Sequence, residues 1–231
     1  MKNLSRDIKI HFVRHVPVIN PNQIWYGETI DYDDKSPRVK KFLKALAQIL
    51  PHVVNTTLWL SSTYPRAIAT GEGVLNELDT PQKPILILNN NFIEQQYGIM
   101  TGRRHEEIAN DPRVTAYMND MWNTAPEGGE SLSMLQFRVG NEIDNLVEKT
   151  PPYIEDVVVF SHGGVAMAAF SHATRQRMID VFTKRKNNDV VDFTPSFSYQ
   201  SSLTLSWLGG TWCPPSYISG LSKDAYHFDK T

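Results

Sequence analysis

Short apolar runs alternate with longer amphipathic segments through most of the chain. Four of these runs have the length of a buried strand and lie at Ile8–Val13, Thr57–Leu60, Ile85–Leu88 and Val157–Phe160. A fifth run, Leu203–Trp207, alternates apolar and polar residues, as an edge strand does. Strands that alternate with helices predict a three-layer α/β/α sandwich with a mostly parallel central sheet, to which the last run adds an antiparallel edge strand.

The segments between the strands carry the signals that begin and end helices. Ser36-Pro37 is a cap followed by a proline at the first helical position, and Pro51 ends the helix that runs to about Leu50. The other predicted helices run from Pro65 to about Leu78, from Ser131 to Lys149 and from about Val165 to Val181, with two short helices within 101–122. Gly209-Gly210 turns the chain toward Thr211-Trp212, and the tail after Pro214 is expected to be irregular.

Length and composition limit the classes of protein to which the chain can belong. Its 231 residues predict one domain, 1–231, and 41% apolar with 21% charged residues is ordinary for a globular protein. A net charge of -2 gives no reason to expect a nucleic acid or an acidic membrane as partner. Cys213 is the sole cysteine, and the first residues lack the apolar core of a signal peptide, so we expect a cytoplasmic protein.

Polar residues with catalytic chemistry follow the predicted strands directly. Arg14-His15 ends the first strand, Arg66 follows the second, Glu94 lies in the loop after the third, and Ser161-His162-Gly163-Gly164 ends the fourth. The carboxyl ends of parallel strands meet at one edge of a sheet, where α/β proteins bind ligands. Two histidines, two arginines and a carboxylate there would form a positively biased pocket with a nucleophile and an acid. Such a pocket suits phosphoryl transfer without a metal.

Each of these residues also has an ordinary structural interpretation. A lone histidine is more often structural than catalytic, and a helical arginine or a loop carboxylate is usually solvated. Their chemistry nevertheless fits one reaction. A neutral imidazole such as His15 can attack phosphorus, the guanidinium of Arg66 can grip two phosphate oxygens, and a helix start at Gly163 offers N–H groups to an anion. A carboxyl group such as Glu94 can donate a proton to a leaving oxygen.

Five short motifs follow one another in a fixed order. They are Arg14-His15-Val16, Ser62 with Arg66, Ala67 and Thr70, Glu94 with Tyr97, Gly98 and Gly102, Gly129-Glu130-Ser131 with Arg138, and Ser161-His162-Gly163-Gly164. Together they resemble the motifs of the histidine phosphatase superfamily, also called phosphoglycerate mutase-like proteins, in its compact phosphatase branch. Because the motifs are spread from residue 14 to residue 164, the resemblance is specific and covers most of the chain.

The resemblance implies a role for each residue at the strand ends. His15 is the nucleophile that becomes phosphorylated, Arg14, Arg66 and His162 hold the phosphoryl oxygens, and Glu94 protonates the leaving oxygen and then helps to activate water. No metal is expected, because the seven histidines include no helical His-Glu-x-x-His and no cysteine partner. No cofactor is expected either. Further contacts with a small phosphorylated substrate are expected from Gly163, Asn20, Tyr26 and Arg103.

Two positions depart from the family pattern. Val16 stands where the family usually has glycine, and a valine with a positive φ would be strained, although Pro17 favours an extended conformation at position 16. This departure bears on the level of activity and on the fit of the substrate. Pro21 stands at the usual place of an asparagine, with Asn20 and Asn22 on either side. The sequence leaves open which of the two takes over that place.

The family performs two reactions, hydrolysis and transfer of a phosphoryl group within a substrate. The chain between Glu94 and His162 lacks the long insertion of the mutases, and the first motif lacks their Glu-Ser. We therefore expect a phosphomonoester hydrolase, a histidine acid-type phosphatase that forms a covalent phosphohistidine. The alternatives left open are a cofactor-dependent phosphoglycerate mutase-type phosphotransferase and a catalytically weak phosphate-binding relative. A homodimer is compatible with the sequence, which carries no signal for or against it.

Overall fold

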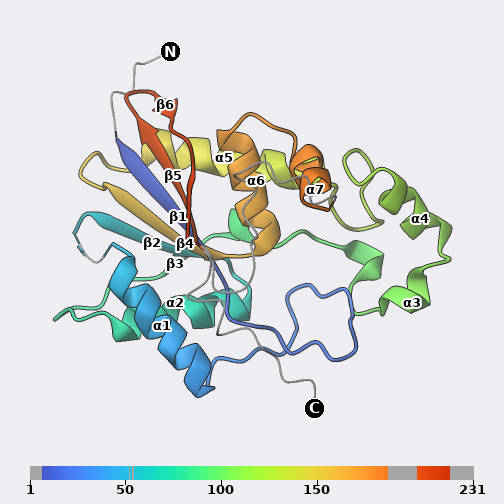
Figure 1. Ribbon diagram of the computed structural model, residues 1–231, viewed down its shortest axis with the longest axis horizontal. Coiled ribbons are helices and arrows are strands. Elements are labelled where there is room, and N and C mark those ends of the chain that lie inside the picture. The colour runs from blue at the N-terminus through green and yellow to red at the C-terminus, as the bar shows by residue number, and fades with distance from the viewer. Residues whose placement is uncertain (1–6, 52, 54, 187–201, 219–231) are drawn as a thin grey trace.

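The described part of the chain folds around one mixed β-sheet (Figure 1). The computed structural model describes residues 7–51, 53, 55–186 and 202–218. Its strands are β1 (Ile8–Arg14), β2 (Thr57–Ser61), β3 (Ile87–Leu88), β4 (Asp156–Ser161), β5 (Ser202–Leu208), β6 (Thr211–Trp212) and β7 (Ser216–Ile218). They lie in the order β3-β2-β4-β1-β5-β6, with β7 also paired to β5. The first four of that order run parallel, whereas β5 is antiparallel to β1 and to both β6 and β7.

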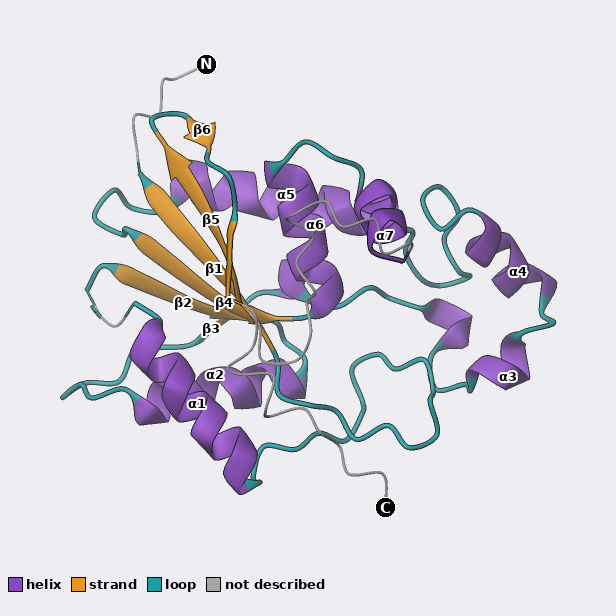
Figure 2. Ribbon diagram, in the orientation of Figure 1, coloured by secondary structure: helices purple, strands orange, loops and turns teal. Residues whose placement is uncertain are grey.

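Helices cover both faces of this sheet (Figure 2). One layer consists of α1 (Pro37–Ile49) and α2 (Pro65–Glu77), and the other of α5 (Leu132–Lys149), α6 (Gly163–Ala173) and α7 (Met178–Lys186). Side chains of β4 alternate between two apolar clusters: Val157 and Val159 pack with residues of α5 and α6, and Val158 and Phe160 with residues of α1 and α2. Burial on both faces explains why this strand is continuously apolar. The three-layer fold class is confirmed.

A smaller group of short helices extends from one end of the sandwich, on the right of Figure 1. It contains the single-turn helix η2 (Gly98–Met100), α3 (His105–Ile108) and α4 (Pro112–Asn119). Its own buried cluster consists of Met100, Ile108, Val114 and Tyr117. Isolated bridges between Ile24 and Arg104 and between Trp25 and Thr101 tie the loop after β1 to this group. The loop is thereby held beside the carboxyl ends of the parallel strands.

Most of the predicted elements are confirmed, including the helix that Ser36 caps, whose hydroxyl accepts a hydrogen bond from the N–H of Val39. The third strand is shorter than predicted. Only Ile87 and Leu88 pair with β2, and Ile85 is 81% exposed. This strand leads into the single-turn helix η1 (Asn90–Phe92).

Three predictions near the end of the chain are wrong. The helix expected from Val165 to Val181 is two helices, because Arg175 after α6 has a φ of 55°, which an α-helix cannot contain. The run Leu203–Trp207 is not an edge, since β5 lies between β1 and the strands β6 and β7. The tail after Pro214 includes β7, and its last part, 219–231, lies outside the described residues. In the part of the chain that the structure describes, no helix has the length and apolar character needed to cross a bilayer.

Candidate active site

The pairing of β1 with β4 brings the two histidines of the first and last motifs together. Arg14 lies opposite Ser161 in the parallel register, and the N–H of His15 donates to the carbonyl of Ser161 at 2.9 Å. The rings of His15 and His162 are consequently 5.1 Å apart between centroids, and both are buried. Residues far apart in the sequence thus share the carboxyl edge of the sheet, as the strand-end argument predicts.

The hydrogen bonds of His15 fix the tautomer of its ring. Arg66 Nε lies 3.2 Å from His15 Nε2, and a guanidinium N–H can only donate, so Nε2 carries a lone pair. The proton is then on Nδ1, which donates to the backbone carbonyl of Val16 at 2.6 Å. His15 Nε2 is therefore the atom that can attack an electrophile, and the ring is oriented from both of its nitrogens.

Arg66 is fully buried in the first turn of α2. Its Nη1 donates to the carbonyl of Gly27 at 2.7 Å and to that of Glu28 at 3.3 Å. Its guanidinium carbon lies 5.0 Å from the ring centroid of Tyr64 and 5.2 Å from that of Tyr26. Two aromatic rings and two carbonyls thus hold the guanidinium in one orientation beside His15, which preorganises it for an anion.

Burial keeps both histidines of the site neutral. It lowers the pKa of His15 well below the usual 6.5, and the positive charges of Arg66 and Arg14 lower it further, while the Val16 carbonyl opposes them. Burial likewise lowers the pKa of His162 well below that value, followed by the effects of His15, Arg66 and Arg14. Because neutral imidazole is the nucleophilic form, His15 is ready to react near neutral pH.

His162 follows β4 and presents one ring nitrogen that lacks a partner. Its Nε2 is 2.8 Å from the Ser62 hydroxyl, which also accepts from the N–H of Tyr64 at 3.2 Å. Its Nδ1 is buried and has no hydrogen-bond partner among the described residues. A buried polar atom without a partner is costly, so this nitrogen suits an oxygen of a bound ligand. Ser62, which sets the ring orientation, stands in the second motif but was not predicted to contact the site.

Arg14 supplies the second guanidinium beside the histidines. A Cβ placed on Gly163 would lie 3.3 Å from the guanidinium carbon of Arg14, so the glycine leaves the space in which this side chain packs. The two arginines give the site a net positive charge with which a phosphate dianion can pair. In the part of the chain that the structure describes, no three His, Cys, Asp or Glu side chains are grouped as metal ligands would be.

The carboxylate of Glu94 reaches the beginning of α6 from a loop between η1 and η2. Its Oε2 accepts from the N–H of Gly164 at 3.3 Å, and its Oε1 accepts from the N–H of Gln95 at 3.0 Å. A Cβ at position 164 would come within 2.3 Å of Oε1. The absence of a side chain at Gly164 is therefore what lets Glu94 approach the strand end that carries His162.

An ion pair holds the segment that precedes Glu94. Arg138 on α5 pairs with Glu130 at 2.5 Å, and its guanidinium also donates to the carbonyls of Asn91 at 2.8 Å and Ile93 at 3.2 Å. On the other side of Glu94, Gly98 has a φ of 51° and lies against the carbonyl of Glu127, where a Cβ would overlap it. The third and fourth motifs thus position the carboxylate.

Val16, the main departure from the family pattern, fits without backbone strain. In the described part of the chain, the non-glycine residues with positive φ are Gln23 and Arg175, so Val16 needs no glycine-like conformation. Its N–H donates to the Thr70 hydroxyl at 2.9 Å, and its side chain is fully buried in the apolar cluster beneath α1 and α2. The valine points into the core and leaves its carbonyl for His15.

A pocket of about 320 Å³ lies beside Glu94. It is lined by Asn20, Gln23, Ile24, Trp25, Tyr26, Glu94, Tyr97 and His105. The Asn20 side chain is engaged in the loop itself, because it both accepts from the N–H and donates to the carbonyl of Ile24, each at 3.0 Å. Tyr26 lines the pocket, and its ring centroid lies 5.2 Å from the guanidinium carbon of Arg66. Arg103 is exposed and does not line this pocket, although its carbonyl accepts from the N–H of Trp25 at 2.9 Å.

The place of His105 in this pocket was not predicted from the sequence. Its ring lies 4.6 Å from that of Trp25, between centroids. No motif surrounds His105, and only the bridges between the loop after β1 and the segment before α3 bring it there. A local pattern could not have identified it.

Comparisons with known proteins bear on the family and the fold. The model of the histidine phosphatase superfamily (branch 1) matches residues 10–189, whereas no curated protein matches the sequence. The fold is similar to that of an alpha-ribazole phosphatase from Shigella flexneri (TM-score 0.70, 17% identity, 89% of this chain and 93% of that chain). It is also similar to a mycobacterial glucosyl-3-phosphoglycerate phosphatase (0.66, 19%, 90% and 97%) and a phosphoglycerate mutase from Bacillus anthracis (0.69, 16%, 96% and 95%). At these identities the likeness concerns the fold alone.

Proposed function

Because the chain belongs to the histidine phosphatase superfamily, we propose that it is a phosphomonoester hydrolase of the histidine acid type, acting on a small phosphorylated metabolite. The observation that carries the proposal is the 3.2 Å hydrogen bond from Arg66 Nε to His15 Nε2. It identifies a lone pair on a buried neutral imidazole, next to a fixed cation that can pair with a phosphate. Nucleophile and anion site therefore coincide.

The first step forms a phosphohistidine. The phosphoryl group lies among Arg14, Arg66 and His162, and His15 Nε2 attacks phosphorus as the bond to the leaving oxygen breaks. Glu94 gives its proton to that oxygen, which leaves as an alcohol. The Val16 carbonyl accepts a hydrogen bond from Nδ1–H and so stabilises the positive charge that develops on the ring. The guanidinium groups stabilise the charge on the transferring oxygens, which is the main catalytic contribution in this class of reaction.

The second step returns the enzyme to its first state. Water attacks phosphorus of the phosphohistidine while the carboxylate of Glu94 takes its proton, and the bond between phosphorus and His15 Nε2 breaks. Inorganic phosphate leaves, and Glu94 is protonated again for the next cycle. No metal is required, because the two arginines supply the positive charge. We place the reaction in the cytoplasm, since a single cysteine suits a reducing compartment.

Two alternatives from the same family are tested by the same assay. Among the similar solved structures are phosphatases and a mutase, so the fold does not decide between them. A mutase would move a phosphoryl group between positions of a phosphoglycerate with little free phosphate. A catalytically weak relative would bind phosphate without turning over an ester. The presence of all five residues of the proposed chemistry, His15, Arg14, Arg66, His162 and Glu94, argues against the weak relative.

The test is release of inorganic phosphate from a panel of sugar phosphates, phosphoglycerates, nucleotides and phosphoproteins, with His15→Asn as the matched inactive variant. We expect stoichiometric phosphate release that His15→Asn abolishes. Isomerisation of a phosphoglycerate without phosphate release would replace the proposal by the mutase. Binding of phosphate with no turnover of any ester would replace it by the non-catalytic relative.

A further inference from the structure

The pocket beside Glu94 has an aromatic wall. The ring of Trp25 lies 4.8 Å from that of Tyr97 at an interplanar angle of 61°, and 4.6 Å from that of His105 at 37°. Tyr26 also lines the pocket. Glu94 is the group that protonates the leaving oxygen under the function proposed above, so the leaving alcohol must extend into this pocket. The wall is therefore a contact surface for the part of the substrate beyond the phosphate.

The loop that carries Trp25 is held in place before any ligand binds. The N–H of Trp25 donates to the Arg103 carbonyl at 2.9 Å, and its carbonyl accepts from the N–H of Gly102 at 2.7 Å. Asn20 closes the same loop through its two hydrogen bonds to Ile24. A ring fixed in this way loses little entropy on binding, which is the condition under which an aromatic contact adds affinity.

The charge around the pocket disfavours a second anionic group on the substrate. Among the residues that line it, Glu94 is the one carboxylate and His105 the one imidazole, and no Arg or Lys lines it. An adjoining hollow that shares Asn20 and Ile24 with the pocket contains Glu28 and Asp31. A second hollow, which shares Gln23 and His105 with it, contains Glu106.

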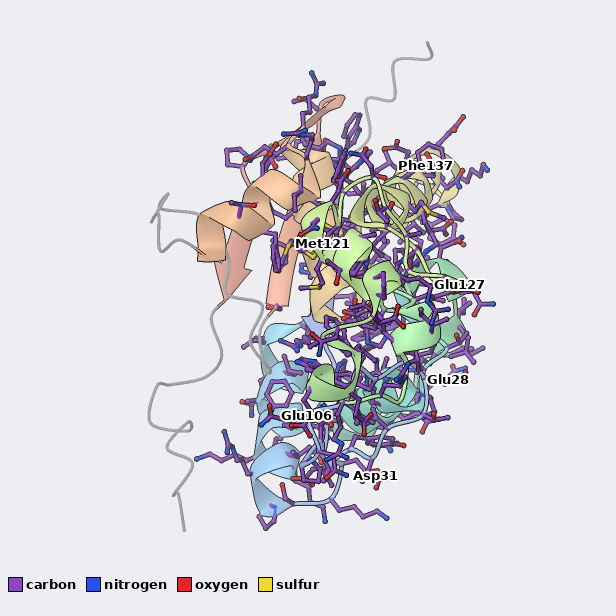
Figure 3. All side chains as sticks on the ribbon, turned by 90° about the vertical axis from the view of Figure 1, so that its right-hand side faces the viewer. Glu28, Asp31, Glu106, Met121, Glu127 and Phe137 are labelled. Atoms are coloured by element: carbon purple, nitrogen blue, oxygen red, sulfur yellow. The ribbon has the colours of Figure 1, made fainter. Side chains whose placement is uncertain are left out.

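The one arginine in these adjoining hollows is already paired. Arg104 lies 3.1 Å from Glu106 and 2.8 Å from Glu107. Figure 3 shows Glu28, Asp31 and Glu106 on the same face of the molecule. A carboxylate or second phosphate on the leaving group would thus meet negative charge without a free cation among the residues that line these hollows.

A positively charged leaving group conflicts with the proposed acid. A cation held beside Glu94 would stabilise the carboxylate form over the protonated form that must donate the proton. The carboxylates that could attract a cation line the adjoining hollows, and not this pocket. An uncharged leaving group avoids both the repulsion that an anion would meet and the loss of the protonated acid beside a cation. The pocket volume of about 320 Å³ is at the lower end for small-molecule sites, which favours a small leaving group.

We propose that the substrate is the phosphate monoester of an uncharged alcohol that carries a planar ring, and that this ring lies against Trp25 and Tyr97. The proposal rests on the proposed function for the position of the phosphate. It specifies the leaving group, which the catalytic residues by themselves leave undefined.

The first experiment compares four probes that share a phosphate but differ in the rest of the molecule. Benzyl phosphate carries a neutral ring, ethyl phosphate a small neutral group, phosphoglycolate an anion and phosphocholine a cation. All are primary alkyl esters, so their need for a proton on the leaving oxygen is broadly similar. We expect kcat/KM for benzyl phosphate to exceed that of each other probe by about tenfold or more, as aromatic stacking provides. Benzylphosphonate and ethylphosphonate, which cannot be hydrolysed at oxygen, should show the same order in calorimetric binding.

Variants of Trp25 then test whether this residue causes the preference for benzyl phosphate over ethyl phosphate. Trp25→Ala should reduce the ratio of kcat/KM for benzyl phosphate over ethyl phosphate to near one, whereas Trp25→Phe should keep most of it. Phe137→Ala, at a residue of α5 that is 71% exposed, is the matched control and should leave the ratio unchanged. If Trp25→Ala does not fold, the inference is tested by the ranking of the four probes with the native protein and by whether Trp25→Phe keeps most of the ratio of kcat/KM for benzyl phosphate over ethyl phosphate.

The outcomes separate this inference from the proposed function. Hydrolysis of all four esters without a preference for the ring, or with phosphoglycolate or phosphocholine ranked first, would overturn the inference and leave the phosphatase intact. A ring preference in phosphonate binding, with no ester hydrolysed, would overturn the phosphatase and support the aromatic pocket. A ring preference that Trp25→Ala retains would place the ring elsewhere and also overturn the inference.

Discussion

Arg66 Nε donates a hydrogen bond to His15 Nε2 across 3.2 Å. The bond occupies the lone pair that attacks phosphorus in the proposed reaction, so Arg66 Nε–H must redirect its hydrogen bond to an oxygen of the incoming phosphate before His15 reacts. Meanwhile the 2.6 Å hydrogen bond from Nδ1 to the Val16 carbonyl keeps the ring in place. Substrate binding therefore releases the nucleophile without turning it.

His15 is expected to be the residue that becomes phosphorylated. Incubation with a ³²P-labelled phosphomonoester, quenching in alkali and mapping of the adduct should place the label on His15. The label should be absent from His15→Asn and present in His172→Asn, which changes a surface histidine paired with Asp144. Label on His162 or on a serine, with none on His15, contradicts the assignment.

Arg66→Ala is expected to lower kcat/KM by a factor that corresponds to about 2–4 kcal/mol of transition-state stabilisation. This is the cost of losing one preorganised donor to the transferring oxygens. Steady-state kinetics on one substrate measure this loss. Arg177→Ala, at an exposed arginine paired with Asp180, is the control and should change kcat/KM little. A loss at Arg66 of less than about tenfold, or 1.4 kcal/mol, would mean that the guanidinium does not contact the phosphate.

The lowered pKa values of His15 and His162 predict how the protonation of the two rings and the stability of the protein depend on pH. In NMR titrations their ring signals should not shift through pH 6.5. Between each lowered pKa and 6.5 the unfolded chain binds protons that the native protein does not. The free energy of unfolding should therefore fall as the pH drops below 6.5, and the fall should end when the pH reaches the pKa values of the two histidines in the native protein.

Urea unfolding of the native protein and of His15→Asn, each at pH 7.5 and pH 5.5, tests the stability part of this prediction. The native protein should lose more stability between the two values than the variant, because the variant lacks one of the two shifted groups. A His15 ring that titrates near pH 6.5, or an equal loss in both proteins, would show that this histidine is not held neutral.

Glu94→Gln is expected to separate acid catalysis from a structural role. Expulsion of an alkoxide needs a proton, whereas p-nitrophenolate leaves without one. The variant should therefore lose far more activity toward ethyl phosphate than it loses in phosphoenzyme formation from p-nitrophenyl phosphate. Rapid-quench kinetics measure the second quantity. An equal loss for both substrates would make Glu94 a positioning residue and His162 the first candidate for the proton donor.

Gly164→Ala is expected to have the same kinetic signature as Glu94→Gln with little loss of stability. The added Cβ would come within 2.3 Å of Glu94 Oε1, which is the end of a flexible side chain and can move away. In a double-mutant cycle, Gly164→Ala should cost much less in the Glu94→Gln protein than in the native one, because the acid is already lost. Additive effects on kcat/KM would mean that Gly164 acts independently of Glu94.

The sequence determined the features that depend on neighbouring residues. Apolar-rich runs located β1, β2 and β4, and the run in β4 is continuous because both faces of this strand are buried. Ser36-Pro37 and Ser131 located helix starts, because caps act within a few residues. The motifs also indicated which residues would meet at the strand ends. The register that brings His15 to His162 is a property of the pairing of β1 with β4 in the structure.

Only the tertiary structure decided what depends on contacts between distant segments. The tautomer of His15 follows from Arg66, the approach of Glu94 follows from the space at Gly164, and the position of His105 follows from bridges to the loop after β1. The interior place of β5 is likewise set by pairing with β1 on one side and with β6 and β7 on the other. These relationships are not encoded in any local pattern, because each is a distance between residues whose separation along the chain says nothing about their separation in space.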